Sequence, residues 1–600
     1  PGFYGCGADG KVQTFSRGGS DVTGSVVAKA VLADVYENWT DVSGVLVADP
    51  RIIENPKPIH TVTYKELREL SYMGASVLHE DAIFPVRTEG IPINIRNTNA
   101  PEAEGTFIVE STCVKPEYTI TGIADALMDS TPMVVIAGQV PSPLLGTDAF
   151  QEVDVIGITQ PITKWAYQIR KPEEIAWAVS RAFYIASTGR PGPVVLDLAK
   201  DAQVGLVDYE YEKVNYIRSY QPEPDIKQER IEAAAALING SKKPFCLVGQ
   251  GVILGGAEEE LKAFLEKNDI PAGSTVLGLS ALPSDFPLHK GMLGMHGNVG
   301  PNRKTNECDV LIAIGMRFDD RVTGDLKTYA KQAKIIHLDI DNSEIGKNVP
   351  VDVKVLGNAK HTIPMITSLL EERKRPEWNA EFEPDEKEEE EKVIRKELFP
   401  TEGQLKMGEV VRKVSEATGN DAILVTDVGQ NQMMGVRYFK YKQTRSVVTS
   451  GGLGTMGFGL PAAIGAKLGA PDRTVCFFTG DGGIQMTIQE LGTIMQEELN
   501  VKIIVLNNNF LGMVRQWQEL FFQERYSNTI MKNPDFVAIA KAFGIASRAV
   551  DSREELDGAI EEMLNHDGAY LLVANVETCG MVYPMVPAGG SVTNMILGDK

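Results

Sequence analysis

The sequence predicts an α/β protein of several domains, each built on a doubly wound parallel sheet. Short apolar runs alternate with helical patterns almost throughout the chain, and each run ends at or just before Gly, Asp, Asn or Thr. Unbroken apolar runs of this length are typical of parallel strands that are buried on both faces. The chain of 600 residues is also long enough for about three to five domains. The runs occupy residues 133–137, 193–197, 245–248, 310–314, 335–338, 422–425, 475–478 and 503–506.

Two breaks in this pattern indicate domain boundaries. Residues 204–228 are polar and poor in strand patterns. Residues 385–392 form a run of Asp, Glu and Lys, which is typical of a solvated linker or a surface helix. We therefore expect a first segment to about residue 205, a middle unit over 228–370, a charged linker over 371–400 and a C-terminal unit over 401–600.

Charge and composition exclude several kinds of partner. The net charge of −22 argues against nucleic acid, because binding to phosphate requires a basic surface. The alternative explanation of the negative charge is that it keeps the protein soluble, and this explanation is sufficient by itself. No apolar run reaches the roughly 18 residues of a membrane span. The six cysteines are scattered without a Cys-x-x-Cys pair, which is typical of a reducing cytoplasm and offers neither a zinc site nor a disulfide framework.

Two polar motifs follow neighbouring apolar runs in the C-terminal unit. Thr-Gly-Asp-Gly-Gly at 479–483 follows one run, and three asparagines at 507–509 follow the next. Ligands of parallel sheets bind beyond the carboxyl ends of the strands, where Asp481 and Asn508 are expected to lie. One carboxylate and one amide oxygen suit Mg²⁺, which takes its other ligands from phosphates and water. The pair therefore predicts a metal-bridged diphosphate; for Asp481 alone, the alternative is an ordinary turn aspartate.

Glycine-rich turns in the same unit supply further candidates for binding phosphate. The turn at 450–465 runs into a helix, and its backbone amides can hold anionic oxygens, although such turns also serve close packing. Asp-Val-Gly-Gln-Asn at 427–431 ends the preceding strand and could also meet phosphate. The candidate cofactor-binding residues of this unit are Gly429, Gln430, Gly454, Met456, Gly480, Gly482 and Gly483.

Taken together, these motifs resemble those of the thiamine-diphosphate enzymes, and among them the acetolactate synthase large subunits, over about residues 121–600. The resemblance implies the architecture of that family and its reaction, which decarboxylates pyruvate and joins the product to a second 2-oxoacid in isoleucine and valine biosynthesis. It also implies a homodimer or homotetramer, with a small regulatory subunit as a further partner. By the same resemblance, the metal ligands are Asp481, Asn508 and the carbonyl of Phe510, Met486 bends the cofactor, and Met513 and Trp517 face the substrate.

The middle unit resembles the FAD-binding domain of the same family. Its motifs are Val-Gly-Gln-Gly at 248–251, Met-Leu-Gly-Met-His-Gly at 292–297, the segment 314–321, and a strand that ends in His-Leu-Asp-Ile-Asp at 337–341. The resemblance implies FAD, and it places Arg317 beside the second 2-oxoacid, whose carboxylate a guanidinium can bind with two hydrogen bonds. The alternatives are a structural role for the histidine and a surface ion pair of Arg317 with Asp319 or Asp320. The implied flavin contacts are Gly251, Gly294, His296, Gly315 and Asp339.

The first segment resembles two families. Residues 137–154 and 162–165 are similar to the synthase pyrimidine-binding domain, so 125–205 is expected to be a truncated copy of it. Residues 1–124 instead resemble part of an aspartate kinase and are expected to form a partial amino-acid-kinase-like α/β segment. The kinase family's Lys-Phe-Gly-Gly turn is not in the sequence. The kinase-like site residues are Arg17, Gly18, Gly19, Ser20, Asp21, Thr40, Asp41 and Arg51.

The junction of the two resemblances lies near residue 124. Thr-Gly-Ile-Ala at 121–124 fits both families, whereas 125–129 fits only the synthase. We hypothesise that two biosynthetic reading frames were joined here, either by recombination or by an error of sequence assembly. One uninterrupted genomic read across codons 110–130 tests this, because two separate genes there would make the chain an artefact.

The synthase resemblance also implies a catalytic glutamate, which this chain does not present in the expected context. In the family, a glutamate beside the aminopyrimidine ring promotes removal of the cofactor's C2 proton. That position falls near Thr88, and both Glu89 and the pair His79–Glu80 lie inside kinase-like sequence, so we interpret their proximity as coincidence. We therefore expect a chain that binds Mg²⁺, thiamine diphosphate and FAD with little or no carboligation. The alternatives are a fragmentary aspartate kinase and an inactive chimeric cofactor-binding chain.

Overall fold

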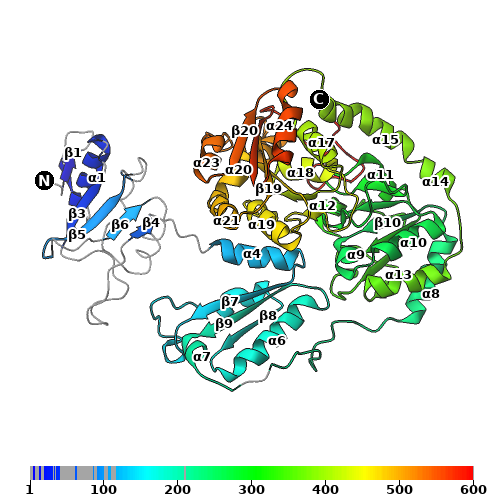
Figure 1. Cartoon of the computed structure of the whole chain (residues 1–600), viewed down its shortest axis with the longest axis horizontal. Helices are drawn as coiled ribbons and strands as arrows, with labels where there is room; N and C mark the ends of the chain where they lie inside the picture. Colours follow the sequence, from blue (N-terminus) through cyan, green and yellow to red (C-terminus); the bar gives the residue numbers. More distant parts are fainter. Residues whose placement is uncertain are drawn as a thin grey trace. The chain divides into compact units, whose positions relative to one another are not determined.

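The computed structural model divides the chain into two compact units, Pro1–Tyr118 and Thr119–Lys600 (Figure 1). It describes residues 4–6, 12–14, 19–31, 33, 35–40, 61–63, 86, 91–100, 106–109, 117–208 and 211–598. Across these residues, no helix combines the length and the apolar character needed to cross a bilayer.

The first unit contains a small mixed sheet whose strands run in the order β3-β5-β6-β4. Strand β5 is parallel to β3 and antiparallel to β6, and β4 is parallel to β6. Ile93, Ile95 and Ile108 are fully buried and form part of its core. The elements of this unit are β1 (Tyr4–Cys6), β2 (Val12–Thr14), α1 (Gly19–Val31), β3 (Tyr36–Thr40), β4 (Thr61–Thr63), β5 (Ile93–Asn97) and β6 (Thr106–Val109).

Only some of the kinase-like residues can be located. Gly19, Ser20 and Asp21 form the start of α1, and Thr40 ends β3. The candidates outside the described residues are Arg17, Gly18, Asp41 and Arg51, together with His79, Glu80, Thr88 and Glu89.

The second unit begins with a three-stranded parallel sheet of strand order β7-β9-β8. The central strand β9 is almost completely buried, whereas Ile136 on the edge strand β7 is 58% exposed. Helix α4 leads into this sheet and contains the junction of the two sequence resemblances. The elements are α4 (Glu117–Met128), β7 (Met133–Gln139), the 3₁₀ turns Ser142–Leu144 and Gln160–Ile162, α5 (Val155–Thr159), β8 (Trp165–Ile169), α6 (Glu173–Ser187), β9 (Pro193–Ala199) and α7 (Lys200–Val204).

The middle of the unit is a six-stranded parallel sheet of order β12-β11-β10-β13-β14-β15. Alternate residues of its strands enter two cores: Cys246 and Ile312 face one, while Phe245 and Leu311 face the other. Both faces are covered, which explains why these strands read as unbroken apolar runs. The elements are α8 (Gln228–Gly240), β10 (Pro244–Val248), α9 (Gln250–Gly255), α10 (Glu258–Asn268), β11 (Ala272–Ser274), a 3₁₀ turn (Val276–Gly278), β12 (His289–Met292), α11 (Val299–Thr305), β13 (Val310–Ile314), α12 (Asp320–Thr323), β14 (Lys334–Asp339), β15 (Val353–Leu356) and α13 (Ala359–Leu369).

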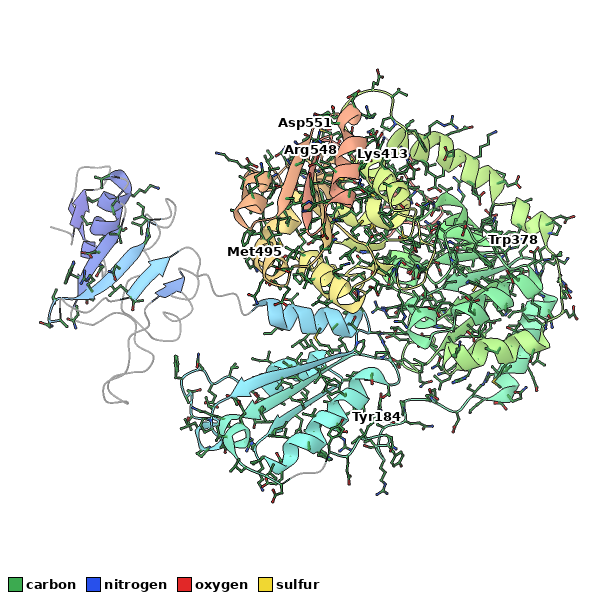
Figure 2. All side chains as sticks on the ribbon, viewed as in Figure 1. Tyr184, Trp378, Lys413, Met495, Arg548 and Asp551 are labelled. Atoms are coloured by element: carbon green, nitrogen blue, oxygen red, sulfur yellow. The ribbon has the colours of Figure 1, made fainter. Side chains whose placement is uncertain are left out.

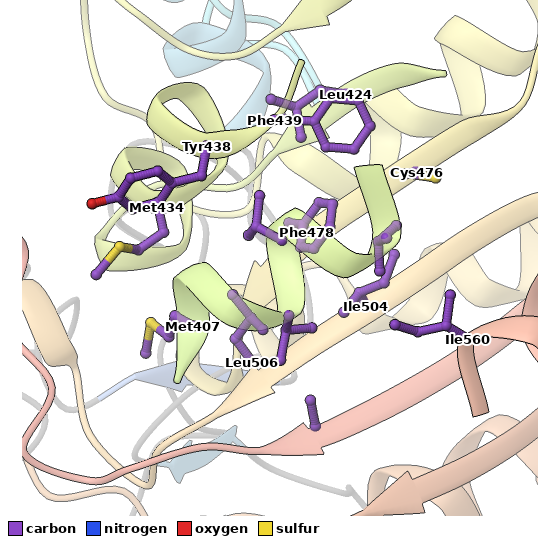
Figure 3. Close-up of a cluster of buried hydrophobic side chains, with 14 of the residues drawn as sticks. Met407, Leu424, Met434, Tyr438, Phe439, Cys476, Phe478, Ile504, Leu506 and Ile560 are labelled. Atoms are coloured by element: carbon purple, nitrogen blue, oxygen red, sulfur yellow. The ribbon is translucent and has the colours of Figure 1, made fainter. Parts of the chain in front are cut away.

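The last part is a second six-stranded parallel sheet, of order β17-β16-β18-β19-β21-β20. Leu424, Phe478 and Ile504 pack in the core on one face, which Figure 3 shows, and Val425 and Phe477 pack in the core on the other. The elements are α17 (Met407–Ala417), β16 (Ile423–Thr426), α18 (Gln430–Tyr438), β17 (Val447–Val448), α19 (Gly459–Gly469), β18 (Val475–Gly480), α20 (Asp481–Met486), a 3₁₀ turn (Ile488–Glu490), α21 (Leu491–Gln496), β19 (Val501–Asn507), α22 (Gly512–Phe521), α23 (Phe536–Ala542), β20 (Ala546–Val550), α24 (Arg553–Asn565) and β21 (Tyr570–Asn575).

The acidic segment between the two large sheets is helical. Trp378, which is labelled in Figure 2, lies at its start. Its indole nitrogen donates a hydrogen bond to the carbonyl of Pro244 at 2.8 Å. Glu389 is 2% exposed and pairs with the equally buried Arg437 of α18 at 2.5 Å. The other oxygen of Glu389 accepts a hydrogen bond from the amide of Val299 on α11 at 2.7 Å. This segment therefore connects the two sheets through a buried charge. Its elements are α14 (Pro376–Ala380), α15 (Glu383–Glu389), a π-helical turn (Glu390–Ile394) and α16 (Arg395–Leu398).

We predict that Glu389→Ala destabilises the second unit by about 3–5 kcal/mol, because it leaves the buried guanidinium of Arg437 without its carboxylate. The exposed neighbour Glu391 provides a matched control, and Glu391→Ala is expected to change stability by less than about 0.5 kcal/mol. Chemical denaturation followed by circular dichroism measures both changes. Equal midpoints for the two variants would show that the pair contributes nothing to stability.

Candidate cofactor and active site

Three neighbouring parallel strands deliver polar residues to one edge of the C-terminal sheet. Strands β16, β18 and β19 lie side by side and end at Thr426, Gly480 and Asn507. Asp481 is the first residue of α20, and Asn508 directly follows β19. Both side chains are almost completely buried. The sheet therefore carries the two predicted metal ligands to the same edge.

A third residue, which the sequence analysis did not identify, connects the loops that carry this pair. The Asn533 amide nitrogen donates to Asp481 Oδ2 at 2.7 Å and to Asn507 Oδ1 at 2.9 Å. The amide of Gly482 donates to the other carboxylate oxygen of Asp481 at 3.0 Å. Burial raises the pKa of Asp481, and the hydrogen bond from Asn533 acts in the opposite direction. Asn508 Oδ1 accepts a hydrogen bond from the amide of Phe510 at 3.1 Å.

The Asp427 side chain holds the glycine-rich turn in place by accepting hydrogen bonds from its backbone. Its Oδ1 accepts hydrogen bonds from the amides of Val428 at 2.7 Å and Gly457 at 3.0 Å, and its Oδ2 accepts one from Gly459 at 3.3 Å. A side chain at Gly483 would come within 2.9 Å of the Asp427 carboxyl carbon, so glycine is needed there. The oxygens of Asp427 therefore hold the turn, and any contact of the segment 427–431 with phosphate has to come from its other residues.

The donor set at this edge fits a magnesium-bound diphosphate. The buried Oδ1 of Asn431 has no hydrogen-bond partner among the described residues, and as an acceptor it suits the cation rather than the phosphate oxygens. Gly429, immediately before α18, has φ of 124°, and Gly454 in the neighbouring turn has φ of 71°, conformations that favour glycine. Mg²⁺ prefers oxygen ligands and binds with one or two carboxylates plus phosphates and water, which matches Asp481 and Asn508.

Two aspartates, Asp125 in α4 and Asp129 directly after it, bind part of the glycine-rich turn. The amides of Gly451 and Gly452 donate to the two oxygens of Asp129 at 2.9 and 2.6 Å. Ser450 donates its hydroxyl to Asp125. Burial raises the pKa of Asp129 to about 6. The first two glycine amides of the turn are therefore used by the protein itself, which the sequence analysis did not foresee.

A cavity of about 1040 Å³ is lined by the middle and C-terminal sheet regions and also by the three-stranded sheet region, which contributes Tyr184 and Arg190. Nine of the candidate residues line it: Gly251, His296, Gly315, Arg317, Asp339, Gly429, Gly454, Met513 and Trp517. The remaining candidates in this unit lie outside the lining, and these are Gly294, Gln430, Met456, Gly480, Asp481, Gly482, Gly483, Met486, Asn508 and Phe510. Four of the five flavin candidates therefore share one space with the substrate-side candidates Arg317, Met513 and Trp517.

The middle-domain side of this cavity has a shape and polarity that fit a flavin. A side chain at Gly251 would lie 2.6 Å from Gly315 Cα, so the two loops can approach only because both residues are glycine. Asp339 ends β14, and burial raises its pKa to about 6. Burial lowers the pKa of His296 to about 4, so the ring is neutral at pH 7 and contacts the carbonyl of Pro584 at 3.1 Å. Burial raises the pKa of Asp319, and the charge of Arg317 opposes this shift, so Arg317 lies near the acid that the surface-pair alternative names.

The two six-stranded sheets both match families of known proteins. Residues 427–574 match the family described as thiamine pyrophosphate enzyme, C-terminal TPP binding domain, and residues 231–366 match the central domain of the same enzymes. Residues 1–97 match the amino acid kinase family.

Similar full-length proteins come from archaea, bacteria and plants. A probable acetolactate synthase large subunit of Methanocaldococcus jannaschii is 43% identical over 491 residues, which are 80% of this chain and 82% of that protein. The acetolactate synthase isozyme 2 large subunit of Escherichia coli is 40% identical over 80% of this chain and 85% of its own length. The chloroplastic acetolactate synthase 1 of Nicotiana tabacum is 41% identical over 80% of this chain and 73% of its own length.

Proposed function

The chain belongs to the acetolactate synthase large-subunit family over four-fifths of its length, and we propose from this that it binds thiamine diphosphate through Mg²⁺ and also binds FAD. The family reaction decarboxylates pyruvate and joins the product to a second 2-oxoacid, a step of branched-chain amino-acid biosynthesis. The observation that carries the proposal is that Asp481 and Asn508 lie at one edge of the sheet, where Asn533 bonds both Asp481 and Asn507, the residue before Asn508.

In this proposal, Asp481, Asn508 and the carbonyl of Phe510 hold Mg²⁺. The backbone around Gly429, Gln430, Gly454, Met456, Gly480, Gly482 and Gly483 holds the diphosphate. When bound, thiamine diphosphate supplies the carbon that attacks a 2-oxoacid and the electron sink that accepts charge as CO₂ leaves. The protein's own task is to fix that cofactor at its diphosphate end.

The substrate side of the proposal uses the shared cavity. Met513 and Trp517 would form the apolar wall toward the 2-oxoacid, and Met486, outside the cavity lining, would support the bend of the cofactor. Arg317 would bind the carboxylate of the second 2-oxoacid, a role supported by its place in the cavity lining and by the two parallel hydrogen bonds that a guanidinium can donate. FAD would be held on the middle-domain side by Gly251, Gly294, His296, Gly315 and Asp339, and the carboxyl of Asp339 would accept hydrogen bonds from hydroxyls of the flavin.

Catalysis by this chain is proposed to be impaired, because the sequence ahead of Thr121 is kinase-like where the family has its glutamate region. The second candidate function is that of a fragmentary aspartate kinase. The match of residues 1–97 to the amino acid kinase family supports such a kinase as the origin of that segment. We further propose a homodimer or homotetramer in the cytoplasm with a small regulatory subunit as partner, and no role for nucleic acid or membrane.

Cofactor binding tests the proposal. We expect the purified chain to retain yellow FAD through gel filtration and to bind thiamine diphosphate only when Mg²⁺ is present. Absorbance of the protein peak and calorimetric titration measure the two properties. A colourless chain with no Mg²⁺-dependent heat of binding would contradict the proposal, whereas ATP-dependent formation of aspartyl phosphate would favour the kinase candidate.

A further inference from the structure

The loop before α23 contributes Asn533 to the predicted metal site. Its amide nitrogen faces three oxygens: Asp481 Oδ2 at 2.7 Å, Asn507 Oδ1 at 2.9 Å and Asn509 Oδ1 at 3.3 Å. An amide nitrogen carries two hydrogens, so the two nearer oxygens can be served together. One hydrogen bond thus reaches the loop after β18, and the other reaches the end of β19.

A neighbouring glutamine fixes the orientation of this amide. Gln485 on α20 donates from Nε2 to Asn533 Oδ1 at 3.0 Å and to the carbonyl of Asp481 at 2.8 Å. Because the oxygen of Asn533 accepts from Gln485, the nitrogen must point toward Asp481 and Asn507. The orientation therefore follows from the hydrogen-bond network.

The segment that carries Asn533 is tied to the ligand loop by the backbone. Asn509 has φ of 59°, in the left-handed region, so the chain turns sharply directly after Asn508. The amide of Leu511 donates to the carbonyl of Thr529 at 2.8 Å, and the amide of Met531 donates to the carbonyl of Asn509 at 2.9 Å. These two bonds hold Asn533 beside both loops.

We propose that Asn533 is a positioning residue of the magnesium site, an inference that rests on the proposed function. By holding Oδ2 of Asp481 and the end of β19 at once, it fixes the distance between the loops that present Asp481 and Asn508. A metal ligand whose orientation is not fixed binds more weakly, and loss of such a supporting partner typically lowers metal affinity about 10- to 100-fold.

The test measures the Mg²⁺ concentration that half-saturates binding of thiamine diphosphate, by calorimetry on the full chain loaded with FAD. Asn533→Leu keeps the branched shape and removes the amide. It is expected to raise the half-saturating Mg²⁺ about 10- to 100-fold, with FAD content and melting temperature unchanged. The matched control is Asn379→Leu, which removes an amide that donates to Asp269 far from the site in sequence, and it is expected to leave the Mg²⁺ requirement unchanged.

A second variant keeps the test decisive if Asn533→Leu fails to fold. Gln485→Met removes the group that orients Asn533 and is expected to raise the Mg²⁺ requirement in the same direction by a smaller factor. An unchanged Mg²⁺ requirement in both variants overturns the inference, as does a joint loss of FAD and thermal stability in Gln485→Met. If the unsubstituted chain binds no thiamine diphosphate at any Mg²⁺ concentration, the proposed function itself fails and the inference falls with it.

Discussion

Replacing Asp481 by Asn is expected to abolish Mg²⁺-dependent binding of thiamine diphosphate. Asp481 supplies the one carboxylate among the proposed metal ligands, and its buried side chain lies where β18 ends. Because loss of a supporting residue alone lowers metal affinity about 10- to 100-fold, loss of the charged ligand should cost at least about 100-fold. Calorimetric titration with the cofactor at fixed Mg²⁺ measures the change, and chelation of the metal from the unsubstituted chain should reproduce it.

Asp472→Asn provides the matched control for this substitution. Asp472 is exposed and belongs to the same sheet domain, in the turn before β18. The Asp472→Asn variant should bind the cofactor with the same affinity as the unsubstituted chain. Equal affinities for the Asp481 and Asp472 variants would show that the metal is held elsewhere.

The cofactor-loaded chain is expected to form acetolactate at least about 100-fold more slowly than an intact family member. A positioned acid–base group contributes about 10²- to 10⁴-fold to catalysis, and the region that supplies it in the family is kinase-like in this chain. Colorimetric detection of acetolactate from pyruvate, with thiamine diphosphate, Mg²⁺ and FAD all saturating, measures the rate. A rate comparable to that of the intact enzyme would refute the proposed impairment.

Glu89 offers an internal control for that prediction. If its position near the family's glutamate is a coincidence, Glu89→Gln leaves the residual rate unchanged. A further drop in rate would indicate that this residue has taken over the catalytic role.

Much of the fold could be predicted from the sequence because most central strands are buried on both faces. The runs at 310–314 and 475–478 are strands β13 and β18, and the α/β class with several parallel sheets is confirmed. Strands β8 and β12 were not predicted. Trp165–Ile169 and His289–Met292 are edge strands that mix polar, aromatic and small residues, so they form no unbroken apolar run.

The site could be predicted only where a motif lies at a strand end. Asp481 and Asn508 follow neighbouring strands, and parallel pairing brings those ends to one edge. Asn533 and Asp129 have no local motif, since their partners lie far away in sequence and are chosen by the tertiary fold. The same reason applies to Glu389, whose acidic neighbours give no sign of a buried arginine partner.

The central claim is that this chain fixes the diphosphate end of its cofactor but cannot activate the other end. Hydrogen–deuterium exchange at C2 of bound thiamine diphosphate tests it most directly, measured by NMR after acid quenching at saturating Mg²⁺. We predict exchange no faster than in the free cofactor, although binding is retained. Acceleration by more than about 100-fold, the size of a general acid–base effect, would contradict the claim.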